Sequence, residues 1–183
     1  MKRIATPPRT MFSMGEYRAA VITVSDASDR GEREDLSGPA VSNLLASNGF
    51  HVEHRAVVPD EQAVIREALV RACEVADLVV TTGGTGIASR DVTPEATREV
   101  CQRLIEGVSE QMRASGRKHT PFSVLSRGLC GIRGKSIILN VPGNPNGARE
   151  SLESVVGLLE HALNLLHGRT AHPPGWHAHV NQK

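Results

Sequence analysis

Short apolar runs alternate along the chain with longer amphipathic segments. Residues 18–25, 76–84 and 135–143 are rich in apolar, often β-branched residues, and each ends in a polar or glycine-rich turn, as buried strands do. Residues 51–59 come closer to strict alternation, which indicates a half-exposed fourth strand. Continuous apolar strands are typical of a parallel sheet that is covered on both faces.

The segments between these strands show the periodicity of amphipathic helices. In residues 36–48 the apolar positions recur at helical spacing, and Asp35 or Ser37 can cap the first turn. Residues 61–73 have the same pattern and follow Asp60, whose carboxylate suits a helix cap.

Two more helices are predicted in the second half of the chain. Thr93 can cap a helix that has Pro94 in its first position and Glu95 beside its positive end. Residues 146–167 carry one stripe of Leu and Val, which predicts a single long helix. Strands that alternate with helices predict an α/β fold with right-handed crossovers.

Both ends of the chain lack this periodicity. Residues 1–17 are basic but carry prolines where a signal peptide needs an apolar region, so we expect a flexible tail. Residues 169–183 are expected to form a second flexible tail, and the histidines that crowd this end lack the spacing of a zinc motif. Residues 18–168 are then one α/β domain, which is large enough to bury its own core.

Composition narrows the range of partners. The formal net charge is +1 and aromatic residues make up 3% of the chain, which argues against binding to nucleic acid or to an anionic membrane. No apolar stretch approaches the roughly 20 residues of a membrane span. Three cysteines without CxxC spacing favour reduced thiols in a cytoplasmic protein over disulfides or zinc.

Polar or glycine-rich turns follow the three buried strands. They are Ser25-Asp26, Thr82–Gly86 and Asn140–Pro145. Ligands of an open parallel sheet bind beyond the carboxyl ends of its strands, so we expect these turns to meet at one edge and Ser25 and Asp26 to help bind a cofactor.

The glycine loop has two interpretations. Gly83, Gly84, Thr85 and Gly86 match neither the P-loop, because the lysine is absent, nor the GxGxxG dinucleotide fingerprint. Glycines let backbone N–H groups approach an anion, which favours a phosphate site. A tight turn between strand and helix, without a ligand, would use the same residues.

If the glycine loop binds phosphate, two acidic residues are candidates for holding a metal ion beside it. Asp91 follows the glycine loop, and a carboxylate repels phosphate unless a cation such as Mg²⁺ lies between them. A local turn in which the side chain binds the backbone would explain Asp91 equally. For Asp60 the alternative is the ordinary helix cap.

Ser126 and Arg127 end a short apolar segment that we expect to be a strand, residues 123–127. They could supply a hydroxyl group or a phosphate contact, or belong to a solvated loop.

Four motifs, in order along the chain, carry a resemblance to a known family. TTGGTGIASRDVTPEAT, LSRG and LNVPGNPNGARESL resemble the MogA/MoaB family of molybdenum cofactor biosynthesis proteins. VVPDEQAVI is similar to the matching stretch of its molybdopterin adenylyltransferase branch, and the likeness runs from Ala20 to Leu166.

The resemblance implies a three-layer α/β sandwich that assembles as a homotrimer in the cytoplasm and can contact other proteins of cofactor biosynthesis. The adenylyltransferase branch transfers AMP from Mg-ATP to the terminal phosphate of molybdopterin and releases pyrophosphate. Asp60 and Asp91 match the family's acidic catalytic pair, which we expect to hold Mg²⁺ directly or through water. The glycine loop matches the phosphate-binding loop, and the residues that match the pterin- and nucleotide-facing loops are Ser126, Pro142, Gly143 and Asn144.

Two other functions stay open. The loop Pro142–Gly147 lies between the patterns of the two branches, so a non-catalytic molybdopterin-binding or scaffold protein of the MoaB type is one alternative. The other is the related domain of competence-damage-inducible proteins. That domain tends to have an acidic doublet after the glycine loop, whereas Asp91 here follows Ser89 and Arg90 as a single acid.

Overall fold

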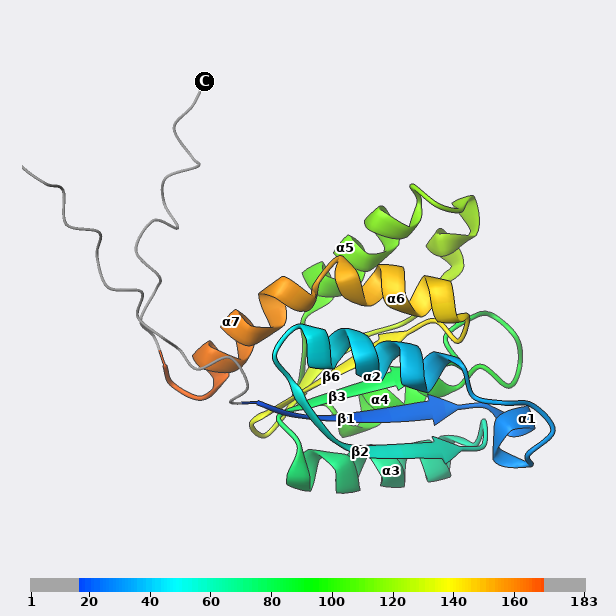
Figure 1. Ribbon diagram of the computed structural model, residues 1–183, viewed down its shortest axis with the longest axis horizontal. Coiled ribbons are helices and arrows are strands. Elements are labelled where there is room, and N and C mark those ends of the chain that lie inside the picture. The colour runs from blue at the N-terminus through cyan, green and yellow to red at the C-terminus, as the bar shows by residue number, and fades with distance from the viewer. Residues whose placement is uncertain (1–16, 170–183) are drawn as a thin grey trace, which may run out of the picture.

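The computed structural model describes residues 17–169, which fold around one mixed sheet (Figure 1). Its strands are β1 (Arg18–Val24), β2 (His51–Val58), β3 (Leu78–Thr82), β4 (Arg103–Leu104), β5 (Cys130–Arg133) and β6 (Ser136–Val141). They form a six-stranded sheet in the order β2-β1-β3-β6-β5-β4. The strands β2, β1, β3 and β6 run parallel to one another. The strand β5 is antiparallel to β6, and β4 is antiparallel to β5. The mostly parallel sheet and its four expected strands are confirmed.

Helices cover both faces of the sheet. They are α1 (Asp26–Asp29), α2 (Ser37–Ser47), α3 (Gln62–Val75), α4 (Thr93–Val100), α5 (Glu106–Gly116), α6 (Pro145–Glu153) and α7 (Val156–Leu166), with a 3₁₀ helix at Pro121–Leu125. One apolar cluster joins the sheet to α2, α5, α6 and α7, and a second joins it to α3 and α4. The chain is therefore the expected three-layer α/β sandwich.

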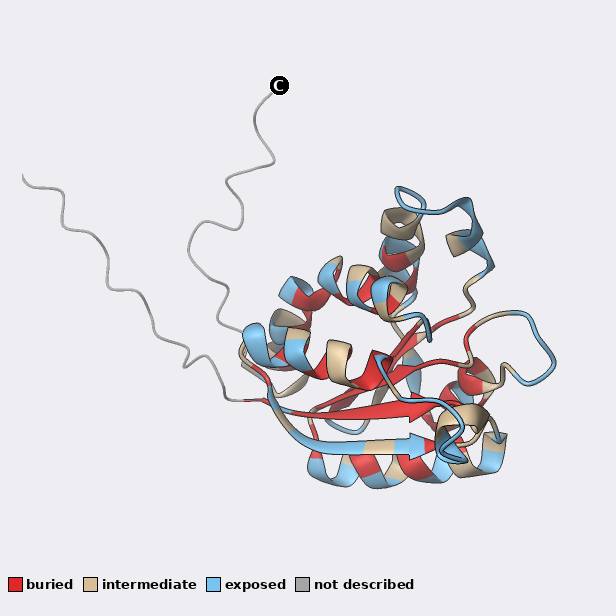
Figure 2. Ribbon diagram, turned by 45° about the vertical axis from the view of Figure 1, so that its right-hand side comes forward, coloured by how far each residue is buried: buried red, intermediate tan, exposed pale blue. Residues whose placement is uncertain are grey.

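The alternation of side chains along β1 divides the core between these layers. Ala19 and Val21 belong to the cluster with α2, whereas Ala20 and Ile22 belong to the cluster with α3. The edge strand β2 is mostly exposed, unlike β1 and β3 (Figure 2). Its alternating sequence pattern predicted this difference.

The predicted helix over residues 146–167 is wrong in one respect, because it is two helices. The break falls at Ser154, whose hydroxyl donates to the carbonyl of Ser151 at 2.7 Å. Val155 leaves helical geometry with a φ of −132° and is buried, 1% exposed, beneath the break. Each helix can then bury its own face against the sheet, and the stripe of apolar residues continues across the interruption.

The strand predicted over residues 123–127 is also wrong. Pro121 begins a 3₁₀ helix, and Thr120 caps it by accepting a hydrogen bond from the N–H of Phe122 at 3.3 Å. Phe122 and Val124 are exposed, so the segment has no sheet neighbour that would fix it as a strand.

The ends of the described range are part of the fold. Tyr17 is buried, and its hydroxyl donates to Oδ1 of Asn164 at 2.9 Å, while the Arg169 guanidinium lies 5.6 Å from its ring centre. The rest of both expected tails, residues 1–16 and 170–183, lies outside the described residues. Within residues 17–169 we find no helix long and apolar enough to cross a membrane.

Candidate functional site

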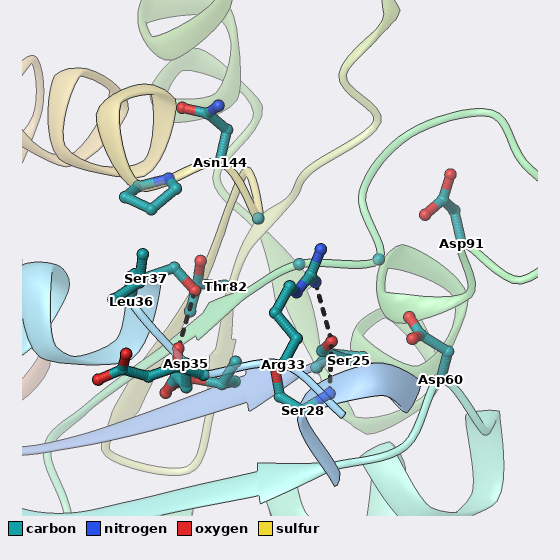
Figure 3. Close-up of a pocket in the computed structure, with 17 residues that line it drawn as sticks. Ser25, Ser28, Arg33, Asp35, Leu36, Ser37, Asp60, Thr82, Asp91 and Asn144 are labelled. Carbon is teal, nitrogen blue, oxygen red and sulfur yellow. Dashed lines mark hydrogen bonds between the residues drawn. The ribbon is translucent and has the colours of Figure 1, made fainter. Parts of the chain in front are cut away.

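The turns after β1, β3 and β6 meet at one edge of the sheet, where they line two neighbouring cavities. The first cavity has a volume of about 570 Å³, and Ser25, Asp60 and Gly83 contribute to its wall (Figure 3). The second has a volume of about 740 Å³, and Thr85, Gly86, Ser126 and Pro142 line it. Both cavities share a wall made of Gly84, Asp91, Gly143 and Asn144.

The expected site residues are therefore brought together, with one exception. Asp26 lines neither cavity. Its carboxylate instead binds the backbone N–H of Asp60 at 3.0 Å and the guanidinium of Arg90 at 2.9 Å. These two partners, the N–H of Asp60 first, hold the pKa of Asp26 below its usual value. Asp26 therefore helps to position Asp60 and does not itself line the cavities.

The glycine loop owes its shape to Thr93. Gly83 and Gly84 have φ values of +108° and +61°, in the left-handed region that favours glycine. The carbonyl of Gly83 accepts a hydrogen bond from the Thr93 hydroxyl at 2.9 Å, and that of Gly84 accepts one from the Thr93 N–H at 3.1 Å. Thr93 lies inside α4, which Val92 precedes, so the predicted capping role of Thr93 is wrong. Its hydroxyl holds the loop instead.

Several backbone N–H groups of the glycine loop and of the loop after β6 have no hydrogen-bond partner in the described part of the chain. Among residues 17–169, the N–H groups of Gly84, Thr85, Gly86, Gly143 and Asn144 donate no hydrogen bond within the protein. N–H groups gathered in this way bind anions without needing a positively charged side chain. The alternative of a turn shaped by sterics alone does not require so many unpartnered donors at a cavity.

Asp60 does not cap α3. One of its carboxylate oxygens, Oδ2, accepts a hydrogen bond from the N–H of Asp26 at 2.8 Å, whereas Glu61 precedes the helix without a side-chain cap. Burial raises the pKa of Asp60, and the nearby carboxylates of Asp26 and Asp91 add to this effect. The interpretation of Asp60 as an ordinary helix cap is wrong.

Asp91 makes the local turn that the sequence allowed and still faces the cavities. Its Oδ2 accepts a hydrogen bond from the N–H of Ala88 at 2.8 Å. Asp60 and Asp91 lie on the same side of the first cavity, on two different segments (Figure 3). Two carboxylates that line one cavity fit Mg²⁺, which binds to one or two carboxylates and keeps several waters. No group of three or more His, Cys, Asp or Glu in the described part of the chain could hold a metal.

The side chain of Asn144 has a structural role. Its Oδ1 accepts hydrogen bonds from the N–H groups of Asn146 at 3.0 Å and Gly147 at 3.1 Å, and so caps α6. Asn144 therefore offers its backbone, not its amide oxygen, to a ligand in the cavities. The carbonyl of Pro142, two residues earlier, accepts a hydrogen bond from the Thr82 hydroxyl at 2.7 Å, which fixes the loop on β3.

Sequence reasoning missed several residues of these walls. Arg33 lines the first cavity, and its Nη2 donates to the Ser25 hydroxyl at 3.1 Å (Figure 3). It comes from a charged run, residues 29–35, which resembles any solvated loop. His119 and Phe122 line the second cavity, and they belong to a segment whose sequence has no motif for a site. Glu150 lines it too, from the motif that begins at Leu139, but its own role was not predicted.

Comparisons with known proteins give a consistent result. The family described as "probable molybdopterin binding domain" matches residues 20–161. A molybdopterin adenylyltransferase of Helicobacter pylori is 43% identical over 162 residues, which cover 85% of this chain and 90% of that protein. The molybdopterin adenylyltransferase of Escherichia coli K12 is 41% identical over 150 residues, 78% of this chain and 75% of that protein. The crystal structure of the molybdopterin biosynthesis enzyme MoaB from Thermus thermophilus has a TM-score of 0.79 and 47% identity, and covers 83% of this chain and 97% of that one.

Proposed function

Because the chain belongs to the family of probable molybdopterin binding domains, we propose that it transfers AMP from ATP to the terminal phosphate of molybdopterin. The reaction releases pyrophosphate and is a step of molybdenum cofactor biosynthesis. Relatives that are molybdopterin adenylyltransferases, 41% and 43% identical over most of the chain, support a catalytic protein over a binding-only one. The resemblance to the MogA/MoaB family is confirmed, and the scaffold alternative is not favoured.

The observation that carries this proposal is the shared wall of the two cavities. Gly84 and Gly143 present unpartnered N–H groups there, beside the carboxylate of Asp91. We assign molybdopterin to the second cavity, because Phe122 and Leu125 offer apolar surface to a fused ring system. ATP then occupies the first cavity, and the two reacting phosphates meet at the wall.

The chemistry needs little help from a base. The second pKa of a phosphate monoester is ~6, so the attacking phosphate is largely deprotonated near neutral pH. The barrier arises from bringing two anions together and from the charge that develops on the leaving pyrophosphate. The unpartnered N–H groups of Gly84 and Gly143, which line both cavities, can stabilise that charge. Those of Thr85 and Gly86 line the cavity assigned to molybdopterin and can bind its phosphate.

Asp60 and Asp91 would hold Mg²⁺, directly or through water. The ion supplies positive charge that screens the two substrates from each other and from both carboxylates. Burial raises the pKa of Asp60, and the carboxylates of Asp26 and Asp91 add to this effect, so a cation beside Asp60 would favour its charged form. Neither acid acts as the proton acceptor.

Incubation with molybdopterin, ATP and Mg²⁺, followed by mass detection of adenylylated molybdopterin, tests the function. We expect Asp91→Asn to lower turnover by about 100-fold or more while molybdopterin still binds. Asp29→Asn, an exposed change on α1, is the control and should keep wild-type turnover. Binding of molybdopterin without any adenylylated product in the wild type would refute the enzyme, and normal turnover of Asp91→Asn would refute the role of Asp91.

The family resemblance also supports a homotrimer in the cytoplasm that passes its product to other proteins of cofactor biosynthesis. Light scattering tests the assembly, because a trimer has three times the 19.7 kDa mass of one chain. A mass of one or two chains would refute it.

A further inference from the structure

We propose that Arg127 is a positioning residue, which holds the loop from Thr85 to Asp91 in its reactive conformation and ties it to Ser126 of the second cavity. This inference rests on the proposed function. Arg127 lines neither of the two cavities, so it acts through the loop and not by contact with a substrate.

Arg127 binds three carbonyl groups of the loop. Its backbone N–H donates to the carbonyl of Thr85 at 2.9 Å, and its Nε donates to the carbonyl of Gly86 at 2.6 Å. Its Nη2 donates to the carbonyl of Asp91 at 2.5 Å. One residue therefore fixes both ends of the loop that separates the first cavity from the second.

Glu95 completes the arrangement from the first turn of α4. Its Oε1 accepts a hydrogen bond from Nη1 of Arg127, so the guanidinium is held on three sides. Burial would raise the pKa of Glu95, but the hydrogen bond from Arg127, a backbone hydrogen bond and the charges of Arg127 and Arg98 together lower it. Within residues 17–169, Oε2 of Glu95 is buried and has no hydrogen-bond partner. Among these residues, Arg127 is thus the only side chain hydrogen-bonded to the Glu95 carboxylate, and we assign Glu95 the role of orienting that guanidinium.

A planar guanidinium is suited to binding three acceptors at once. The acceptors Gly86, Asp91 and Glu95 lie in different directions around one side chain. Arginine can donate to all of them at fixed angles, whereas the ammonium group of lysine is a single point. Release of the carbonyl of Asp91 would let its carboxylate move away from the shared wall, and a misplacement of about 1 Å can cost about 100-fold in rate.

The test compares Arg127→Ala and Arg127→Lys with the control Arg71→Ala. Arg71 lies on α3, where it pairs with the exposed Glu67. We expect both Arg127 variants to lose about 100-fold in kcat, with KM values for both substrates within about threefold of wild type. Methylguanidine should restore part of the kcat of Arg127→Ala, and it should not restore Asp91→Ala. Arg71→Ala should behave as wild type.

Hydrogen exchange of the free protein separates this inference from the proposed function. The N–H groups of Ala88 and Asp91 are hydrogen-bonded within the loop, so they should exchange faster in Arg127→Ala and slow again with methylguanidine. Unchanged exchange, or a kcat of Arg127→Ala near that of wild type, would overturn the inference. Absent turnover in the wild type would refute the enzyme, whereas the exchange rates would still show whether Arg127 holds the loop.

Discussion

The backbone of Gly83 lies against the carbonyl group of Val24. A Cβ atom added to Gly83 would stand 2.2 Å from that oxygen, and the φ of Gly83 is already +108°. Backbone meets backbone at this point, so no side chain can turn away to relieve the contact. This contact joins the turn after β1 to the glycine loop after β3.

Gly83→Ala should therefore destabilise the protein by about 3 kcal/mol, through strain and through separation of the two turns. Urea unfolding measures the loss. Gly134→Ala is the matched control, because Gly134 also has a positive φ, +57°, but an added Cβ meets nothing within 4 Å. It should cost about 1 kcal/mol. Equal losses for the two variants would contradict the packing argument.

Asn140→Ala should cost about 2–3 kcal/mol. The side chain of Asn140 is 1% exposed, and its Nδ2 donates to the hydroxyls of Thr81 and Thr97, each at 2.9 Å. Its Oδ1 accepts a hydrogen bond from the N–H of Leu129 at 3.1 Å, and the variant would leave this part-buried donor without its partner. Thermal or urea unfolding measures the change. Asn48→Ala, on the exposed end of α2, should stay within about 0.5 kcal/mol of wild type.

Asp60 should make stability depend on pH. Its folded-state pKa lies above the ordinary value of 3.8, mainly through burial, so the folded protein binds this proton more tightly than the unfolded chain does. As pH rises through the range between 3.8 and the folded pKa, ionisation of Asp60 removes stability. Asp60→Asn should be more stable than wild type at neutral pH, and this gain should shrink in acid. Urea unfolding at several pH values measures it, and a gain that grows in acid would contradict the assignment.

Single changes in each cavity should affect different substrates. Ser126→Ala, in the second cavity, should raise KM for molybdopterin about tenfold, which corresponds to about 1.4 kcal/mol for a lost hydrogen bond to a charged group. Arg33→Ala, in the first cavity, should raise KM for ATP to a similar extent. Steady-state kinetics with each substrate varied in turn gives both values. Exchange of the two effects would reverse the assignment of the cavities.

The strands and the place of the site could be predicted because they depend on local patterns. The turns after the three apolar runs meet at one edge, as the topology of a parallel sheet requires. The strands β5 and β4 could not be predicted, because Cys130–Arg133 and Arg103–Leu104 are too short for a pattern.

Roles set by tertiary contacts could not be read from the chain. The sequence neighbours of Asp26 give no sign that its carboxylate binds the N–H of Asp60, which lies 34 positions further on. Thr93 suits a helix cap locally, yet its hydroxyl finds the carbonyl of Gly83 in the folded protein. Both residues were predicted by type and position, and in both a distant backbone group decides what the side chain does.

Gly84 and Gly143 leave the wall between the two cavities without side chains larger than those of Asp91 and Asn144. The two binding spaces therefore adjoin each other along these four residues. If each holds one substrate, a single bisubstrate inhibitor that crosses this wall through a phosphate linker would exclude both at once. Such an inhibitor would make the contacts of both substrates. It would lose translational freedom once, whereas two separate ligands lose it twice, so it should bind more tightly than either.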